Sequence, residues 1–179
     1  MQTRGERKAG LVEAAYQSIA QHGLEGLRLR TVADQVGIDH STLHHHFATK
    51  QQLVAAVVER ATAPLRTTMP AAGTSGGRLR EHLQSLARMI EASPDLFVVL
   101  AEIDLRARRD AETRRIIEEV ERGWRRALAD VLGSRSEAVE LVIAAVKGVR
   151  LRPEAAPAVL ELVADLLESR SGGAGRSAP

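Results

Sequence analysis

The chain has 179 residues, enough to bury the core of one or two small domains. It contains no cysteine, which excludes disulfides, thiolate metal sites and cysteine nucleophiles, and its 2% aromatic content argues against modules that stack RNA bases. The formal net charge of +2 and the sequence pI of about 9.5 permit a nucleic-acid partner but do not require one.

The hydrophobic pattern indicates helices throughout. Ala, Leu, Val, Arg and Glu dominate the composition, and β-branched alternation is absent, so we expect an all-α protein. No run of about 18 apolar residues occurs, and residues 1–10 are charged rather than apolar. We therefore expect neither a membrane span nor a signal peptide, and we expect a cytoplasmic location.

Three helices are predicted at the start of the chain. Apolar residues at helical spacing indicate a first helix over residues 3–21, and Gly23 follows where a left-handed C-terminal cap would lie. A short second helix is predicted over residues 29–36 and is broken at Gly37. A third short helix, capped by an aspartate, is predicted over residues 39–47.

The second and third of these helices have the pattern of a helix-turn-helix. The small side chain of Ala33 lets two helices cross closely, and Gly37 accepts the positive φ of the turn at low cost. Ile38, Leu43 and Phe47 would tie the third helix to the first. The outer face of the third helix would then present His40, Ser41, Thr42, His44 and His45.

The middle of the chain predicts a fourth helix and a connection. Thr49 and Gln52 match a capping box, in which the side chain of each residue accepts a hydrogen bond from the backbone amide of the other. This predicts a helix that begins at Thr49 and runs to about Thr62. Residues 67–77 are rich in Thr, Ala, Gly and Ser and predict a flexible connection between two helical blocks.

The rest of the chain predicts five more helices, about nine in all. Ser134 and Glu137 match a second capping box, and Gly133 ends the long charged helix before it. The composition of residues 171–179 predicts a disordered tail. The five helices are expected over residues 79–92, 95–108, 111–132, 134–151 and 158–168.

Residues 42–47, with the sequence Thr-Leu-His-His-His-Phe, are followed by Lys50 and Leu53. On this run, residues 4–57 resemble the DNA-binding domain of the tetracycline-repressor (TetR) family of bacterial regulators. Family members typically have an aromatic residue, usually Tyr, at the position of His44. They have a Ser or Thr cap before the second helix, where this chain has Arg.

The resemblance implies a role for each part of the chain. It implies an N-terminal three-helix DNA-binding domain over residues 1–49 and a C-terminal helical domain for effector binding and dimerisation over residues 50–170. By position, Arg30, Thr31 and Lys50 would contact DNA phosphates, whereas Ser41, Thr42, His44 and His45, beside His40, would face the major groove. Lys50 also lies in a first helical turn, where backbone amides attract a phosphate.

Two other features have competing interpretations. His40 and His44 are four residues apart and could ligate a metal, but no third ligand lies at matching spacing, so we expect neither a metal nor a cofactor. The charged residues within 113–126 could form a second nucleic-acid site. A solvated helix face with i,i+4 ion pairs is the favoured interpretation.

An effector cavity is predicted among scattered large apolar residues of the second block. The candidate lining residues are Met89, Phe97, Leu100, Trp124 and Leu128. Ordinary core packing stays open as the alternative for each of them.

The last two predicted helices carry more apolar residues than one layer of neighbours would cover, which predicts a homodimer through a four-helix bundle. The residues concerned are Val139, Val142, Ile143, Val146, Val159, Leu162, Val163 and Leu166. A monomer in which these helices are wholly internal is the alternative.

The predicted function is that of a one-component transcriptional regulator. The resemblance implies a repressor that a small-molecule effector releases from a palindromic DNA operator, provided that the effector prefers the non-binding conformation. A ligand-independent DNA-binding or adaptor protein is the alternative. An enzyme is not expected, because the chain has no nucleophile elbow, no glycine-rich phosphate loop and no His-Glu-x-x-His helix.

Overall fold

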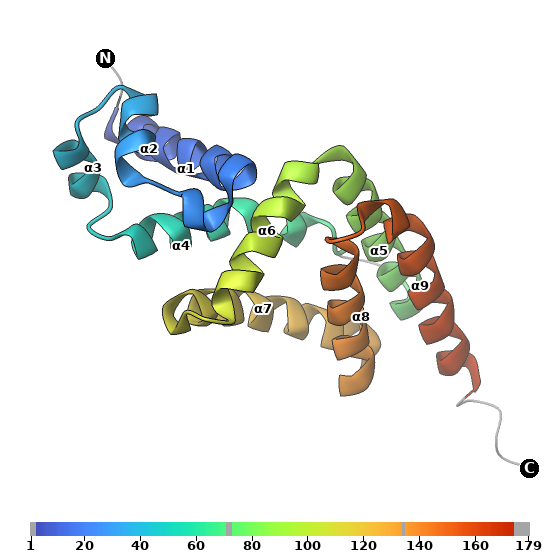
Figure 1. The fold of residues 1–179 in the computed structure, drawn as a ribbon. Helices are drawn as coiled ribbons and strands as arrows, with labels where there is room; N and C mark the ends of the chain where they lie inside the picture. Colours follow the sequence, from blue (N-terminus) through green and yellow to red (C-terminus); the bar gives the residue numbers. More distant parts are fainter. Residues whose placement is uncertain (1–2, 71–72, 134, 174–179) are drawn as a thin grey trace, which may run out of the picture. The chain divides into compact units, whose positions relative to one another are not determined.

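The computed structural model describes residues 3–70, 73–133 and 135–173, and within these ranges it confirms an all-helical fold with nine α-helices and no strand (Figure 1). None of these helices is long and apolar enough to cross a membrane. The α-helices are α1 (Arg4–Gly26), α2 (Leu29–Val36), α3 (His40–His46), α4 (Lys50–Thr62), α5 (Ser75–Ala92), α6 (Pro94–Ala107), α7 (Ala111–Leu132), α8 (Ser136–Val149) and α9 (Ala156–Gly173), with short 3-10 helices η1 (Pro64–Thr67) and η2 (Pro153–Ala155).

The chain folds into two compact units. The first unit comprises the residues up to 63 together with residues 95–120, and the second comprises residues 64–94 together with those from 121 onward. The first unit therefore holds α1 to α4, α6 and the first part of α7. These units describe packing, and the boundary of the functional domains at residue 50 stays a prediction.

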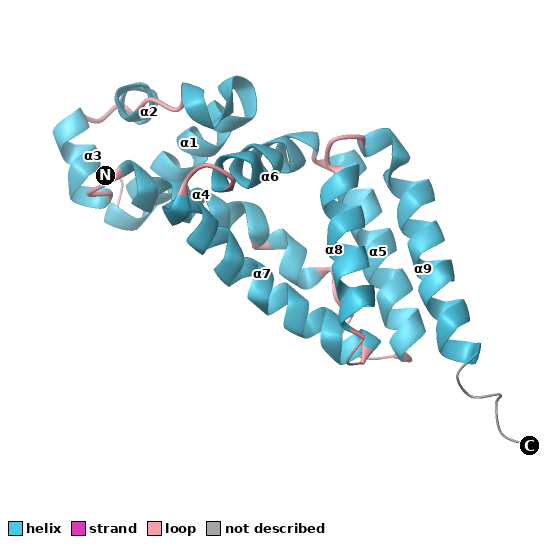
Figure 2. Ribbon diagram, turned by 60° about the horizontal axis from the view of Figure 1, so that its bottom comes forward, coloured by secondary structure: helices cyan, strands magenta, loops and turns pink. Residues whose placement is uncertain are grey.

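In the first unit, α1 packs against both α2 and α4, and α2 packs against α3 (Figure 2). Ala33 is fully buried, in keeping with a close approach of two helices. Gly37 ends α2 in the left-handed conformation with φ 73°, and the following amide of Ile38 donates to the Ala33 carbonyl at 3.1 Å. The buried apolar residues of this core include Leu11, Ile19, Leu43, Phe47 and Leu53.

The end of α1 differs from the expected helix over residues 3–21. Gly23 has φ 68° and ψ 170°, which interrupts the helix, but the chain then makes a further helical stretch that ends at Gly26. The Leu24 amide, which the interruption frees, donates to Glu102 Oε2 of α6 at 3.0 Å. Gly23 therefore marks a corner rather than the end of the helix, because a residue 78 positions away supplies the missing acceptor.

The predicted capping residues lie at the starts of helices, but some of their hydrogen bonds differ from those expected. Thr49 Oγ1 accepts the Gln52 amide at 3.2 Å as expected, whereas Gln52 Oε1 accepts the amide of Ala48 at 2.9 Å rather than that of Thr49. Asp39 is the N-cap of α3, but its side chain makes no capping bond. The second predicted capping box includes Ser134, which lies outside the described residues.

The C-terminal helices differ from the predicted ranges at their ends. The helix α8 ends at Val149, two residues before the predicted end, and α9 extends on both sides of the predicted range 158–168. Residues 171–173 of the expected disordered tail are helical, and residues 174–179 lie outside the described residues. Residues 71–72 of the expected connection also lie outside them.

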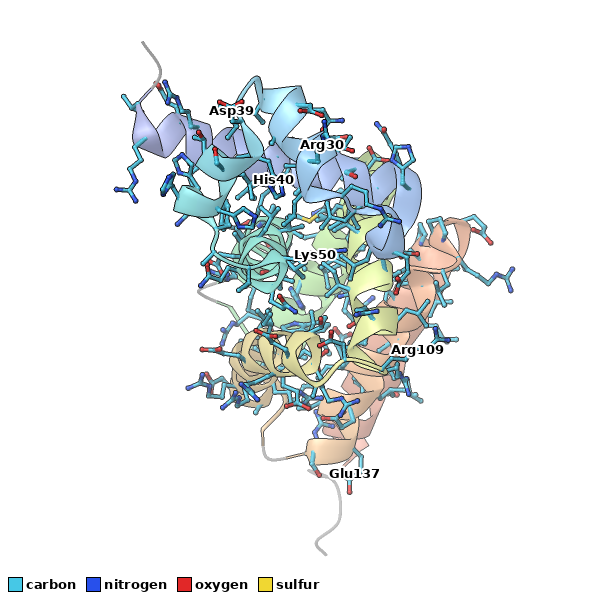
Figure 3. All side chains as sticks on the ribbon, turned by 60° about the vertical axis from the view of Figure 1, so that its left-hand side comes forward. Arg30, Asp39, His40, Lys50, Arg109 and Glu137 are labelled. Atoms are coloured by element: carbon cyan, nitrogen blue, oxygen red, sulfur yellow. The ribbon has the colours of Figure 1, made fainter. Side chains whose placement is uncertain are left out.

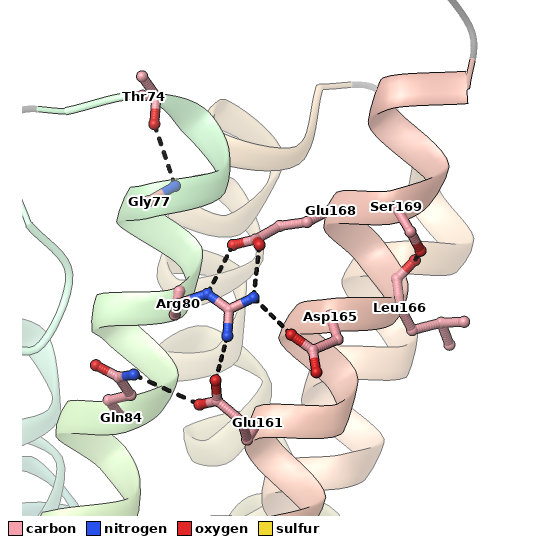
Figure 4. Close-up of polar contacts among 9 residues, drawn as sticks. All are labelled: Thr74, Gly77, Arg80, Gln84, Glu161, Asp165, Leu166, Glu168 and Ser169. Carbon is pink, nitrogen blue, oxygen red and sulfur yellow. Dashed lines mark hydrogen bonds and ion pairs between the residues drawn. The ribbon is translucent and has the colours of Figure 1, made fainter.

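In the second unit, α9 lies beside both α5 and α8 (Figures 1 and 2). The side chain of Arg80 on α5 meets three carboxylates of α9, as Figure 4 shows: its Nε lies 3.0 Å from Glu168 Oε1, its Nη2 lies 2.7 Å from Asp165 Oδ1, and its Nη1 pairs with Glu161. The hydrogen bonds that Arg80 donates to Glu168 and Asp165 raise the pKa of its guanidinium group. The same two helices, α5 and α9, also bury apolar side chains. These are Leu79, Leu83, Leu86, Ile90, Leu160, Ala164 and Leu167.

The corner at Gly23 gives a first testable prediction. Gly23→Ala should lower the free energy of unfolding by about 2 kcal/mol, because its backbone conformation is essentially restricted to glycine. A Cβ there would also lie 2.9 Å from Glu102 Oε2, so the carboxylate must leave the Leu24 amide. Urea unfolding followed by circular dichroism measures the loss.

The matched control for this prediction is Gly37→Ala. Gly37 has φ 73°, but nothing lies within 4 Å of a Cβ placed there, so a loss of about 1 kcal/mol is expected from the backbone conformation alone. Equal losses in the two variants would contradict the special role of the Gly23 corner.

Candidate nucleic-acid interface

The helix α3 exposes one polar face and buries the opposite one. Leu43 is fully buried, and Phe47, the C-cap residue, is buried as well. On the other side His40, Ser41, His44 and His45 are exposed, and Thr42 is half-buried. The structure thus brings the residues predicted to face the major groove onto one short helix of the first unit.

The rings of His40 and His44 lie edge to face, with centroids 4.6 Å apart. Their spacing on α3 permits this contact because residues four apart share a helix face. Among the described residues no group of three His, Cys, Asp or Glu side chains could hold a metal ion. Both rings are exposed, and their nitrogens are groups with which a histidine can hydrogen-bond a base edge.

The start of α2 places Arg30 and Thr31 at the surface of its first turn. The N-cap residue Arg28 makes no side-chain capping bond. Its Nη1 instead donates to the Glu25 carbonyl at 2.5 Å. The first amides of α2 thus have no side-chain cap, and an uncapped helix start together with the nearby cation favours a phosphate.

Lys50 connects the start of α4 to the segment that precedes α2. Its Nζ donates to the Leu27 carbonyl at 2.9 Å, and Figure 3 labels its position together with Arg30, Asp39 and His40. Burial, followed by the nearby charge of Arg28, lowers the pKa of Lys50. An ammonium group has three donors, so a phosphate can bind Lys50 without breaking this bond. The bond from Lys50 to the Leu27 carbonyl was not predicted from the sequence, which gives no local sign of it.

An open cleft of about 540 Å³ lies where α1, α2 and α3 meet. Its lining includes Arg7 but also the carboxylates Asp34 and Asp39, which would repel phosphate. The cations Arg28, Arg30 and Lys50 lie elsewhere in the unit, at the starts of α2 and α4. The charge distribution therefore favours an anion such as a phosphate at those two helix starts rather than along the cleft.

The five residues proposed for an effector cavity are divided between the units. Phe97 and Leu100 are buried residues of the first unit, whereas Met89, Trp124 and Leu128 belong to the second. Their shared role as an effector site stays a prediction.

A buried polar chain runs through the second unit beside Trp124. The indole Nε1 of Trp124 donates to His82 Nε2 at 3.1 Å, so the neutral ring carries its proton on Nδ1 and donates to Thr68 Oγ1 at 2.9 Å. The Thr68 hydroxyl in turn donates to the Leu65 carbonyl at 2.6 Å. The side-chain polar groups of Trp124, His82 and Thr68 are therefore all hydrogen-bonded. Burial lowers the pKa of His82 to about 4.

The residues predicted for a dimer interface lie in two different settings. Val139, Val142, Ile143 and Val146 of α8 and Val163 of α9 are buried within the unit, and Val159 is half-buried. Leu162 and Leu166 of α9 are 67% and 46% exposed. Leu141 on α8 is also exposed and had not been singled out, since its place in an apolar helix gives no local sign of which face is free.

The chain is similar to known regulators. Residues 11–57 match the family described as "Bacterial regulatory proteins, tetR family". The HTH-type transcriptional regulator BetI of Agrobacterium fabrum is 27% identical over 115 residues, which make up 62% of this chain and 56% of that protein. The HTH-type transcriptional repressor KstR2 of Mycobacterium tuberculosis is 40% identical over 48 residues, 27% of this chain and 24% of that protein. The matches to BetI thus span little more than half of that protein's length.

The fold is shared over almost the whole chain. A transcriptional regulator from Rhodococcus sp. Rha1 has a crystal structure that superposes with a TM-score of 0.79 at 24% identity, covering 92% of this chain and 96% of that one. This likeness extends well beyond the helix-turn-helix and includes the helices of the second unit.

The buried His82 makes the stability of the second unit sensitive to acid. Above pH 6.5 the ring is neutral in both the folded and the unfolded chain, and its contribution is fully present. As the pH falls from about 6.5 toward 4, the unfolded chain binds a proton that the folded chain does not, so the free energy of unfolding should fall. Urea unfolding at pH 7.5, 6.5 and 5.5 measures this decline.

Two variants isolate the contribution of His82. In His82→Gln the decline between pH 6.5 and 5.5 should become shallower, whereas in His22→Gln, which changes an exposed histidine, it should match the wild type. Parallel pH curves for the wild type and His82→Gln would contradict the assignment.

Proposed function

The chain belongs to the tetR family of bacterial regulatory proteins, and we propose that it is a dimeric repressor which a small-molecule effector releases from a palindromic DNA operator. The regulator would act in the cytoplasm, where it meets its DNA. DNA binding and transcription regulation are the work of the family. The repressor role, the dimer and the effector are the steps proposed for this chain.

The exposed polar face of α3 is the observation that carries the proposal. Its His and Ser side chains both donate and accept hydrogen bonds, as reading a base edge requires, and the buried Leu43 keeps the helix in place beneath them. Arg30 and Lys50 supply the positive charge for phosphate contacts at the starts of α2 and α4.

A second copy of the chain would pair through the exposed apolar face of α8 and α9, which we call the α8–α9 face. It consists of Leu141, Ala144 and Gly148 on α8 and Leu162 and Leu166 on α9. Ala144 and Gly148 are exposed and small, so two backbones can approach closely, while the leucines supply apolar area. Symmetric pairing through this face gives two α3 helices, as a palindromic operator requires.

The effector would act on the balance between two conformations of the dimer. Because α4 continues along the chain into η1, it joins the DNA-binding helices covalently to the second unit. An effector releases DNA only if it binds the non-binding conformation more tightly than the binding one. A ligand-independent DNA-binding or adaptor protein is the second candidate, and release of the operator by a small molecule separates the two.

The α8–α9 face gives a prediction on the oligomeric state. Leu162→Glu should convert a dimer to a folded monomer, because the new charge would be desolvated at the interface. The control is Leu105→Glu, which changes a leucine of α6 that is 57% exposed and should leave the dimer intact. Sedimentation velocity measures both. A wild-type monomer, or a dimeric Leu162→Glu variant, would contradict the proposed face.

The direct test of DNA binding is selection from a random pool of duplexes with the purified chain. We expect enrichment of a palindrome, bound on the order of a thousandfold more tightly than a scrambled duplex at physiological salt. The absence of any enriched sequence would contradict the proposed repressor and favour the adaptor.

Substitutions in the two helix starts and in α3 then assign the contacts. Lys50→Ala should weaken binding to every sequence and reduce the salt slope by about one, whereas Thr42→Ala should change the preferred sequence. Arg109→Ala removes an exposed cation of the same unit as a control. Since Lys50 also holds the Leu27 carbonyl, circular dichroism must show that the variant is folded. Unchanged binding by both Lys50→Ala and Thr42→Ala would show that α3 and the start of α4 do not contact DNA.

A further inference from the structure

The residues 23–28, which we call the α1–α2 corner, are held by side chains from distant parts of the first unit. The Leu24 amide donates to Glu102 Oε2 of α6 at 3.0 Å. One turn further along α6, Arg106 Nη1 lies 2.7 Å from Glu25 Oε1. Lys50 of α4 donates to the Leu27 carbonyl at 2.9 Å. Backbone and side-chain groups of the corner are thus tied to two other helices.

Close packing alone does not fix this corner. A cavity of about 70 Å³ lies beside it, lined by residues that include Leu24, Glu25, Lys50 and Arg106. The corner also contains Gly23, which has no side chain to pack. Two of the ties reach the backbone itself, that of Glu102 at Leu24 and that of Lys50 at Leu27. Each involves a charged side chain, and such hydrogen bonds are worth more than those between neutral groups. Glu102 is therefore the residue that holds the backbone at the start of the corner, as Lys50 holds it near the end.

The corner in turn determines where α2 begins. Arg28, the last residue of the corner, is the N-cap of α2, and no side-chain bond caps the helix there. The exposed Arg30 follows two residues later in the first turn. A displacement of the corner would therefore move the first turn of α2 with it.

We propose that Glu102 is a positioning residue for DNA binding, which sets the start of α2 by holding the Leu24 amide. The proposal rests on the proposed function, since it concerns the affinity for the operator. It assigns a role in DNA binding to a residue of α6, 45 positions beyond the end of the matched segment at residue 57.

The sign of the effect separates this role from a simple charge effect. Removing a carboxylate from a protein that binds DNA reduces electrostatic repulsion, so a surface charge at this place would give tighter binding when it is removed. A positioning role predicts the opposite. Loss of the bond to Leu24 lets the corner shift, and binding weakens although the protein has become more positive.

The test compares the operator affinities of three variants in the full-length protein. Glu102→Ala should bind on the order of tenfold more weakly than the wild type, which corresponds to the loss of one hydrogen bond to a charged group. Glu102→Gln should retain most of the affinity, because the amide oxygen still accepts from Leu24, although the bond is weaker without the charge. The control Glu119→Ala, which removes an exposed carboxylate of the same unit, should bind as tightly as the wild type or slightly more tightly.

The salt dependence gives a second criterion. Glu102→Ala should keep the salt slope of the wild type, because no side chain that contacts phosphate is removed. Binding by Glu102→Ala that equals or exceeds that of the wild type would overturn the proposal. An equal loss in Glu102→Gln would also overturn it, because the charge and not the bond would then be responsible.

Hydrogen exchange at the Leu24 amide tests the same bond without DNA. Exchange should be slow in the wild type and in Glu102→Gln and fast in Glu102→Ala, and equal rates in all three would overturn the proposal. If the wild type selects no operator, the proposed function fails and the positioning role fails with it, whatever the exchange rates. If the wild type binds its operator and Glu102→Ala binds equally well, the positioning role alone fails.

Discussion

A helix of seven residues is too short to persist by itself in water, so α3 takes its shape and place from the side chains that it buries. Leu43 lies fully buried beneath it, and Phe47 follows at its end with the ammonium of Lys8 5.5 Å from the ring centroid. Because the exposed residues of α3 carry none of this packing, they are free to serve recognition without a cost to the fold. The DNA-binding role proposed for the chain depends on this separation.

The elements that local signals define were predicted closely. The predicted helices over residues 29–36 and 111–132 have the observed bounds, because Gly37 and Gly133 each end a helix with a positive φ. The start of α4 was also predicted, since Thr49 caps it through its own side chain. In each case the physical cause lies within a few residues of the helix end, and the sequence shows it directly.

The features that could not be predicted depend on contacts between distant residues. The Leu24 amide just past Gly23 donates to Glu102, 78 residues later in the chain, and the partner of Lys50 is a carbonyl 23 residues earlier. On α8 and α9 the apolar periodicity identified the helices, but it could not separate the face that packs inside the unit from the face that stays exposed. Val142 and Leu162 look alike in the sequence, yet the first is buried and the second is not. Only the position of neighbouring helices decides between them.

Trp124 is the one tryptophan of the chain, and its indole nitrogen is bonded to a buried histidine in the second unit. Light absorbed selectively by indole is therefore emitted from a single known place in the protein. The emission wavelength of indole depends on the polarity around the ring and on the hydrogen bond at its nitrogen. The unlabelled protein thus contains its own optical reporter, placed in the second unit beside the buried His82.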